Sequence, residues 1–174
     1  AIALKDSDSS GIFETDSGTK QEDAVMTIME KSVSKAYFDY RASLYSACDS
    51  SNPVKDAEDL MKKQAVQWSF AEEHGLLPSE QEIREYCISI REAANSDPEN
   101  REIMLSIVQS MGLTEAEYFE IIQPKYEVPY ILIEQNISEY CEENGVDKPA
   151  WENAELNIKD ENYMKKIEAK YNVA

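Results

Sequence analysis

Histidine is the side chain that most often supplies a catalytic base or a metal ligand, and this 174-residue chain has one, His74. A zinc site needs several His or Cys ligands at short spacings, so a single histidine cannot provide a histidine pair. The chain also lacks the sequence G-x-S-x-G, the turn that exposes a nucleophilic serine. We therefore place His74 at a helix end, where it is favourable to the helix dipole, and expect no catalytic residue and no metal site.

Cysteine could supply a nucleophile, a metal ligand or a disulfide. Cys48, Cys87 and Cys141 are too few and too scattered for a disulfide scaffold, and no C-x-x-C pair occurs. Cys87 and Cys141 stand in predicted helices beside apolar neighbours, where a free thiol behaves as a small apolar group. We interpret both as buried free thiols, with a Cys87–Cys141 bridge as the alternative, and we expect no cofactor.

Carboxylates dominate the charge, because 35 acidic residues stand against 17 basic ones and give a net charge of −18. Adjacent pairs such as Glu72–Glu73 and Glu142–Glu143 point about 100° apart on a helix, so we interpret them as solvated rather than as shared sites. Nucleic acid and anionic lipid surfaces bind clustered Lys and Arg, so neither is an expected partner. Without a long apolar run, direct insertion into a membrane is not expected either.

Aromatic side chains are the remaining candidates for a functional surface. Large amphipathic rings give adaptable contacts with apolar peptides, so they could line a groove for unfolded polypeptide segments. At helical spacing the same rings are typical of helix packing, and both interpretations can hold in part. The candidate peptide-binding residues are Tyr37, Tyr40, Tyr45, Ile122, Tyr126 and Tyr130.

Residues 56–94 contain the two helices that position the rest of the chain. The first has an apolar stripe at three- and four-residue steps, and Val66 and Phe70 outside the stripe indicate a central helix. Gly75 is placed for a left-handed C′ residue, and Ser79 with Glu82 forms a capping box for the second helix. The two predicted buried stripes are Ala57, Leu60, Met61, Ala65, Trp68 and Ala71, and then Ile83, Tyr86, Cys87, Ile90 and Ala94.

Further helices are predicted on both sides of this pair. Ser32 or Ser34 caps a helix at residues 35–47, and Pro98 opens another that ends at Gly112. Thr114 and Glu117 repeat the capping box. The predicted buried face of the helix after Pro98 is Ile103, Met104, Ile107, Val108 and Met111.

Pro124 and Pro129 cannot both lie inside a straight helix, because each lacks an N–H and clashes with the preceding turn. We expect a kink or a short break there that leaves a groove, followed by a helix at residues 129–143. A C-terminal helix is predicted after Pro149, with residues 157–160 as the place where it would break.

The first 24 residues are polar, with two short apolar pieces, and we interpret them as a flexible or lightly paired arm. Residues 25–29 alternate weakly and predict a short strand. The fold class is therefore all-α, with at most a small β element near the N-terminus, in one helical domain at residues 25–174.

Three segments resemble the SurA-type N-terminal chaperone domain. The strand, turn and helix that open such domains are similar to VMTIMEKSVSKAYFDYRASLY, and the next unit is similar to DLMKKQAVQWSFAEEHGLLPSEQEIREYC. The family's G-L-T-x-x-E-Y helix and the long helix after it resemble MGLTEAEYFEIIQPKYEVPYILI. Together the segments cover residues 25–143. The turn before the first helix reads Glu30–Lys31–Ser32 instead of the usual Asn-Gly, and nothing resembles a parvulin isomerase domain.

The resemblance implies a multi-helix domain with long antiparallel helices that binds unfolded or apolar polypeptide segments without catalysis. It further implies a place outside the cytoplasm, in a secreted or envelope-anchored bacterial protein. A structural interaction module of a cell-envelope assembly is the alternative function. A second alternative function is that of the chaperone part of a prolyl isomerase whose catalytic domain is absent. A second copy of the chain is an alternative partner.

Overall fold

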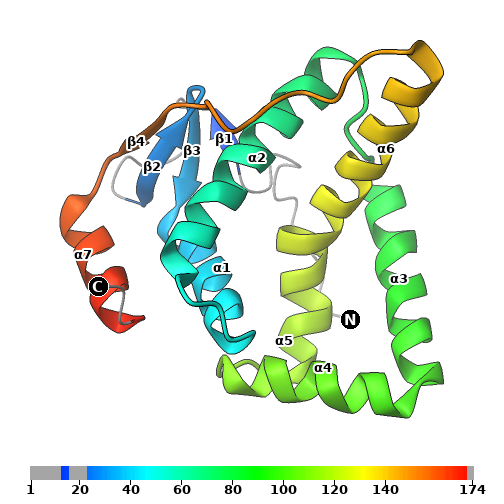
Figure 1. Ribbon diagram of the computed structural model, residues 1–174. Coiled ribbons are helices and arrows are strands. Elements are labelled where there is room, and N and C mark those ends of the chain that lie inside the picture. The colour runs from blue at the N-terminus through cyan, green and yellow to red at the C-terminus, as the bar shows by residue number, and fades with distance from the viewer. Residues whose placement is uncertain (1–12, 16–22, 172–174) are drawn as a thin grey trace.

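Helices form most of the part of the chain that the computed structural model describes, which is residues 13–15 and 23–171 (Figure 1). This confirms the mainly helical character predicted from the sequence. The β element is larger than expected, because four short strands form one sheet. Most of the predicted arm at residues 1–24 lies outside the described residues, and its described part includes strand β1 (Phe13–Thr15).

The sheet is antiparallel throughout, in the order β1-β3-β2-β4. Strand β2 (Ala24–Ile28) matches the prediction for residues 25–29, whereas β3 (Lys31–Ser34) and β4 (Leu156–Ile158) are not predicted. Strands this short show too few alternations to be recognised in a sequence. Because β4 pairs with β2, the sheet joins the two ends of the described chain.

A two-residue turn connects β2 to β3, since Ile28 pairs with Lys31. Met29 (φ 51°) and Glu30 (φ 65°) are both left-handed, as a type I′ turn requires. The turn is therefore Met29–Glu30, not the predicted Glu30–Lys31–Ser32. Neither residue type favours this conformation, so the backbone is strained there.

Helix α1 (Lys35–Ala47) has the predicted bounds. The Ser34 hydroxyl caps it by accepting a hydrogen bond from the Tyr37 N–H at 3.2 Å, whereas Ser32 lies in β3. Its fully buried residues are Tyr37, Phe38, Tyr40 and Ala42. Ala36, in its first turn, is exposed.

Helix α2 (Pro53–Glu73) packs on α1 and is the central helix of the fold. It begins before the predicted Asp56, because the Asn52 side chain caps it and Pro53 suits the first helical position. Trp68 is only 8% exposed, and Val66, outside the predicted stripe, is also buried. Gly75 (φ 69°) ends the helix as predicted. The prediction of burial on more than one face is thus confirmed.

Helices α3 (Glu80–Ser96) and α4 (Pro98–Ser110) begin where their caps predict. The Ser79 hydroxyl accepts from the Glu82 N–H at 3.2 Å, and the Glu82 carboxylate accepts from the Ser79 N–H at 2.7 Å. Asp97 caps α4 directly before Pro98. Both starts are confirmed.

The stripes predicted for α3 and α4 lie on the correct faces but are less deeply buried than predicted. The half-buried residues of α3 are the five predicted ones, Ile83, Tyr86, Cys87, Ile90 and Ala94. No residue of α3 is fully buried, and Val108 is the single fully buried residue of α4. Ile103, expected inside, is 55% exposed. Figure 1 shows the physical reason: α3 runs along the outer side of α6, and α4 crosses below, so each is covered on one side.

The predicted break at Pro124 takes a different form. Helix α5 (Glu115–Glu117) continues without a loop into a π-helix, η1 (Tyr118–Glu127), and then into α6 (Val128–Asn144). In these wide turns an N–H bonds the carbonyl five residues earlier, as the Val128 N–H does with Gln123. Widening moves away the carbonyl that the Pro124 ring meets in an α-helix. Pro129 lies in the first turn of α6, where proline is tolerated.

The C-terminal segment returns across the molecule to the sheet (Figure 1). The predicted C-terminal helix is confirmed only after Asp160, as α7 (Glu161–Lys170), and β4 lies in the stretch where a break was expected. Met164 and Ile167 are buried, and the Tyr163 hydroxyl donates to the Lys35 carbonyl at 3.1 Å. These contacts attach α7 to the start of α1.

Candidate functional site

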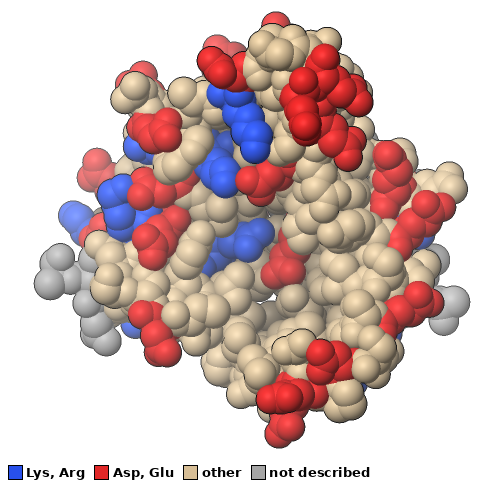
Figure 2. Space-filling model, turned by 45° about the vertical axis from the view of Figure 1, so that its right-hand side comes forward, with Lys and Arg blue, Asp and Glu red and all other residues tan. Residues whose placement is uncertain are grey.

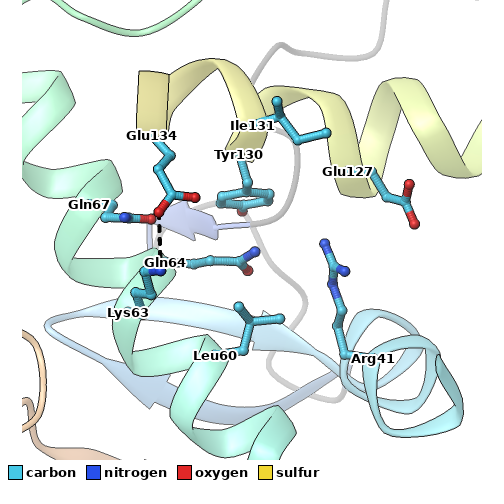
Figure 3. A pocket seen from close by; sticks show the side chains of 9 residues that line it. All are labelled: Arg41, Leu60, Lys63, Gln64, Gln67, Glu127, Tyr130, Ile131 and Glu134. Atoms are coloured by element: carbon cyan, nitrogen blue, oxygen red, sulfur yellow. Dashed lines mark hydrogen bonds and ion pairs between the residues drawn. The ribbon is translucent and has the colours of Figure 1, made fainter. Parts of the chain in front are cut away.

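A pocket of about 280 Å³ lies between the middle of α2 and the junction of η1 with α6, and Arg41 of α1 stands at one end (Figure 3). The space-filling view shows that this side of the molecule is hollowed, with acidic and basic side chains around the hollow (Figure 2). The lining residues are Arg41, Leu60, Lys63, Gln64, Gln67, Glu127, Tyr130, Ile131 and Glu134. The lining thus includes one residue of the segment 35–47, Arg41, and residues of the η1–α6 region, the two regions that carry the sequence-predicted candidates.

Four of the six predicted candidates form one stack of rings beside the pocket. The Tyr126 ring lies 5.0 Å from Tyr37 and 5.6 Å from Tyr40, and Tyr37 lies 6.1 Å from Tyr130. Tyr37, Tyr40 and Tyr130 are buried, so in this conformation their rings hold α1 against η1 and α6. Of the six, Tyr130 alone lines the pocket.

The other two candidates lie elsewhere in the packing. Ile122 belongs to the hydrophobic core, with 8% exposure. Tyr45 is half-buried and packs against that core near Asp56 and Lys63. Neither residue lines the pocket.

Arg41 is the functional candidate that sequence reasoning missed. Its Nε–H donates to the Tyr37 hydroxyl at 3.0 Å, and its Nη2 donates to the Tyr126 carbonyl at 2.7 Å. The guanidinium also lies 5.5 Å from the centres of the Tyr37 and Tyr40 rings. Its position four residues after Tyr37, on the same helix face, was the available signal.

The Tyr37 hydroxyl fixes the orientation of Gln64. Since it accepts from Arg41, its own proton goes to the Gln64 Oε1, 2.6 Å away. Burial raises the pKa of Tyr37, which keeps that proton in place. The Gln64 oxygen is therefore an acceptor for Tyr37, and its amide nitrogen is left to donate toward the pocket.

Glu127 lies at the same end of the pocket as Arg41 (Figure 3). One carboxylate oxygen accepts from the Tyr40 hydroxyl and the other from the Tyr118 hydroxyl, at 3.1 Å. Burial, with the Glu127 charge, raises the pKa of Tyr118 to about 12 and that of Tyr40 further. Both tyrosines thus stay protonated, and the carboxylate stays an acceptor.

The other end of the pocket is bounded by an ion pair between α2 and α6. Lys63 Nζ lies 3.2 Å from the Glu134 carboxylate (Figure 3). Leu60 and Ile131 contribute apolar surface between the two ends. With two cations, two carboxylates and two amides, the lining can bind a polar ligand through hydrogen bonds.

His74 and the cysteines lie outside this lining. The His74 ring stacks on Phe70 at 4.2 Å, and its Nδ1 lies 2.9 Å from the Phe70 carbonyl, at the end of α2 as predicted. All three thiols are free: Cys141 is buried, Cys87 is half-buried and Cys48 is exposed. The alternative Cys87–Cys141 bridge is therefore not formed.

Comparison of the chain with protein-family models, with curated proteins and with solved structures found no match. No helix of the described residues is long and apolar enough to cross a lipid bilayer. Over the same residues, no group of three His, Cys, Asp or Glu side chains is placed to hold a metal ion.

Proposed function

We propose that this domain binds unfolded or apolar polypeptide segments without catalysing a reaction on them, as a chaperone-like domain. The resemblance of residues 25–143 to SurA-type domains suggests that it acts outside the cytoplasm. The observation that carries the proposal is the pocket between α2 and the η1–α6 junction, which lies beside the aromatic segments expected to contact a client.

Exposed apolar side chains on η1 and α3 support the proposal. Ile121 of η1 is 54% exposed, and Ile88 of α3 is 57% exposed. Isoleucine side chains this accessible on neighbouring helices give an apolar segment adaptable contacts beyond the pocket itself. The acidic surface around them keeps the domain soluble and favours basic clients at low salt.

The test is suppression of aggregation. A reduced, unfolded model protein is mixed with the domain, and its aggregation is followed by light scattering. We expect suppression at near-stoichiometric ratio. A folded, monomeric sample without any suppression would contradict the proposal.

The variant for this test is Ile131→Asn, since Ile131 is a half-buried pocket residue whose replacement leaves the tyrosine stack intact. Tyr37 and Tyr40 are unsuitable because their buried rings are needed for folding. Val146→Asn is the matched control, because Val146 is 46% exposed and does not line the pocket. We expect Ile131→Asn to weaken suppression and Val146→Asn to leave it unchanged.

The α3–α4 pair favours a second candidate function, that of a structural module with a fixed partner. Helix α3 has no fully buried residue, and Ile88 and Ile103 are largely exposed on adjoining helices. A constant partner would cover these side chains. Co-purification of one stoichiometric partner, without suppression of aggregation, would favour this function.

A further inference from the structure

We infer that the pocket binds a single peptide group of an extended polypeptide segment, with its C=O toward α1 and α2 and its N–H toward η1 and α6. This inference rests on the proposed function and names what part of the client enters the site. In a trans peptide the C=O and the N–H point to opposite sides of the chain, so a complementary site has donors on one wall and acceptors on the other.

The donors lie on the α1–α2 wall. Gln64 is 3% exposed, and its bond from Tyr37 leaves the amide nitrogen to face the pocket. Arg41 uses Nε and Nη2 for Tyr37 and Tyr126, and Nη1 is then the nitrogen left for a ligand. Lys63 adds a second cation at the far end.

The acceptors lie on the opposite wall. Each oxygen of Glu127 accepts one tyrosine proton and keeps a second lone pair for another donor. Glu134, about two helical turns further along, pairs with Lys63 and is the second carboxylate. Figure 3 shows both carboxylates on the ribbon that faces the donor wall.

The charge of the pocket disfavours isolated ions as ligands. Two cations and two carboxylates cancel, so an isolated anion meets Glu127 and Glu134, and an isolated cation meets Arg41 and Lys63. A neutral peptide group has no net charge to be repelled. The volume of about 280 Å³ has room for a peptide group with one adjoining apolar side chain against Leu60 and Ile131.

The experiment changes the ligand and leaves the protein intact. The probe is a short fluorescein-labelled peptide of glycine and serine with one central leucine, and binding is followed by fluorescence anisotropy. Each amide is N-methylated in turn, which removes one N–H and keeps the C=O. We expect one position to lower the affinity about tenfold or more, the loss that a charge-assisted hydrogen bond produces, and the others to change it little.

A protein variant tests the donor wall. Gln64→Glu retains an oxygen for the Tyr37 hydroxyl and replaces the donating nitrogen with an acceptor, so we expect about tenfold weaker binding of the parent peptide. Gln109→Glu on the exposed face of α4 makes the same chemical change away from the pocket and should have no effect. Thermal unfolding of both variants checks that they are folded.

The outcomes separate this inference from the function beneath it. If the parent peptide binds but no N-methyl position matters, the peptide-group assignment is wrong and the polypeptide-binding function stands. If no peptide binds, both are wrong. If free glycyl-leucine competes as well as the parent peptide, the pocket is a site for a small zwitterion and the inference is overturned.

Discussion

A carboxylate held by two tyrosine hydroxyls links α1 to the π-helix at the level of single residues. Tyr40 comes from α1, Tyr118 begins η1, and Glu127 ends it, so the three side chains span the whole π-helix. Arg41 and Tyr37 extend this network to Gln64 of α2. The pocket is therefore held by the same hydrogen bonds that join three helices.

The tyrosines of this network predict a loss of stability at high pH. The pKa of Tyr118 is about 12 in the folded chain, against an ordinary value near 10, and that of Tyr40 is raised further. Between these values the folded state keeps the phenolic proton while the unfolded state loses it. The free energy of unfolding is thus full below pH ~10 and decreases as the pH rises toward ~12.

Urea unfolding at several pH values across this window measures the decrease. Tyr118→Phe removes one of the titrating groups, so its free energy of unfolding should fall less steeply than that of the unaltered chain. A free energy of unfolding that is constant from pH ~10 to ~12 would contradict the burial of these hydroxyls.

Trp68→Ala should destabilise the domain by about 3–5 kcal/mol, because it removes a large buried ring from the central helix. The ring is 8% exposed and lies 6.1 Å from the Tyr130 ring. Trp151→Ala is the matched control, since Trp151 is half-buried outside the helices and should cost less. A loss below about 1 kcal/mol for Trp68→Ala in urea unfolding would mean that the ring does not contribute to the core.

Residue types and spacing predict the tyrosines of this site but not its polar residues. Tyr37, Tyr40 and Tyr126 are recognisable because ring types at helical spacing indicate a shared face. Gln64, Arg41 and Glu127 have ordinary polar types, and their roles depend on partners in distant segments, such as Tyr37 for Gln64 and Tyr118 and Tyr40 for Glu127. A single sequence does not show which distant segments meet.

At the scale of elements, local sequence signals predict where a helix begins better than they predict which of its residues are buried. Ser79, Asp97 and Thr114 mark three helix starts through bonds within the first turn, so neighbouring residues contain all the information. The burial of Ile103 depends on which other elements cover α4, and the sequence of α4 does not contain that information. The missed strand β4 likewise exists because β2 lies beside it.

The hairpin turn offers a stabilising substitution. Glu30 has φ 65°, where a residue with a Cβ atom costs about 1–2 kcal/mol, and glycine costs roughly 0.5–1 kcal/mol through the unfolded chain. Glu30→Gly should therefore raise the free energy of unfolding by about 0.5 kcal/mol. The comparison is Asp49→Gly, because Asp49 (φ 62°) is a type that tolerates this region and should gain less. Equal gains, or a loss at Glu30, in urea unfolding would show that the turn is not strained.

At the scale of the whole molecule, the arrangement places a well-covered half beside a sparsely covered one. The sheet, α1, α2 and α7 share the buried core residues, whereas α3 and α4 form an outer frame with a single fully buried residue, Val108 (Figure 1). Elements with little buried surface open at lower free energy than the core. The pocket is lined by residues of α1, α2, η1 and α6, elements that all supply core residues, so a client held there contacts the well-covered part of the molecule.

A Glu→Lys substitution should affect the free energy of unfolding differently at the two ends of a helix, because the helix dipole has opposite signs there. Each Glu→Lys change reduces the net negative charge of 18 by two, which relieves repulsion over the whole molecule. Glu143 lies in the last turn of α6, whose carbonyl end is negative and has no basic residue. Glu143→Lys should therefore raise the free energy of unfolding by about 0.5–1 kcal/mol.

Glu80→Lys is the comparison, because Glu80 lies in the first turn of α3, where the helix dipole favours an acidic residue. This substitution relieves the same net repulsion but loses the favourable interaction with the dipole. In urea unfolding at low salt, Glu143→Lys should be the more stable variant, and the difference between the two should shrink near 0.15 M salt, where the screening length is about 8 Å. Equal free energies of unfolding at low salt would mean that only net charge matters in this acidic protein.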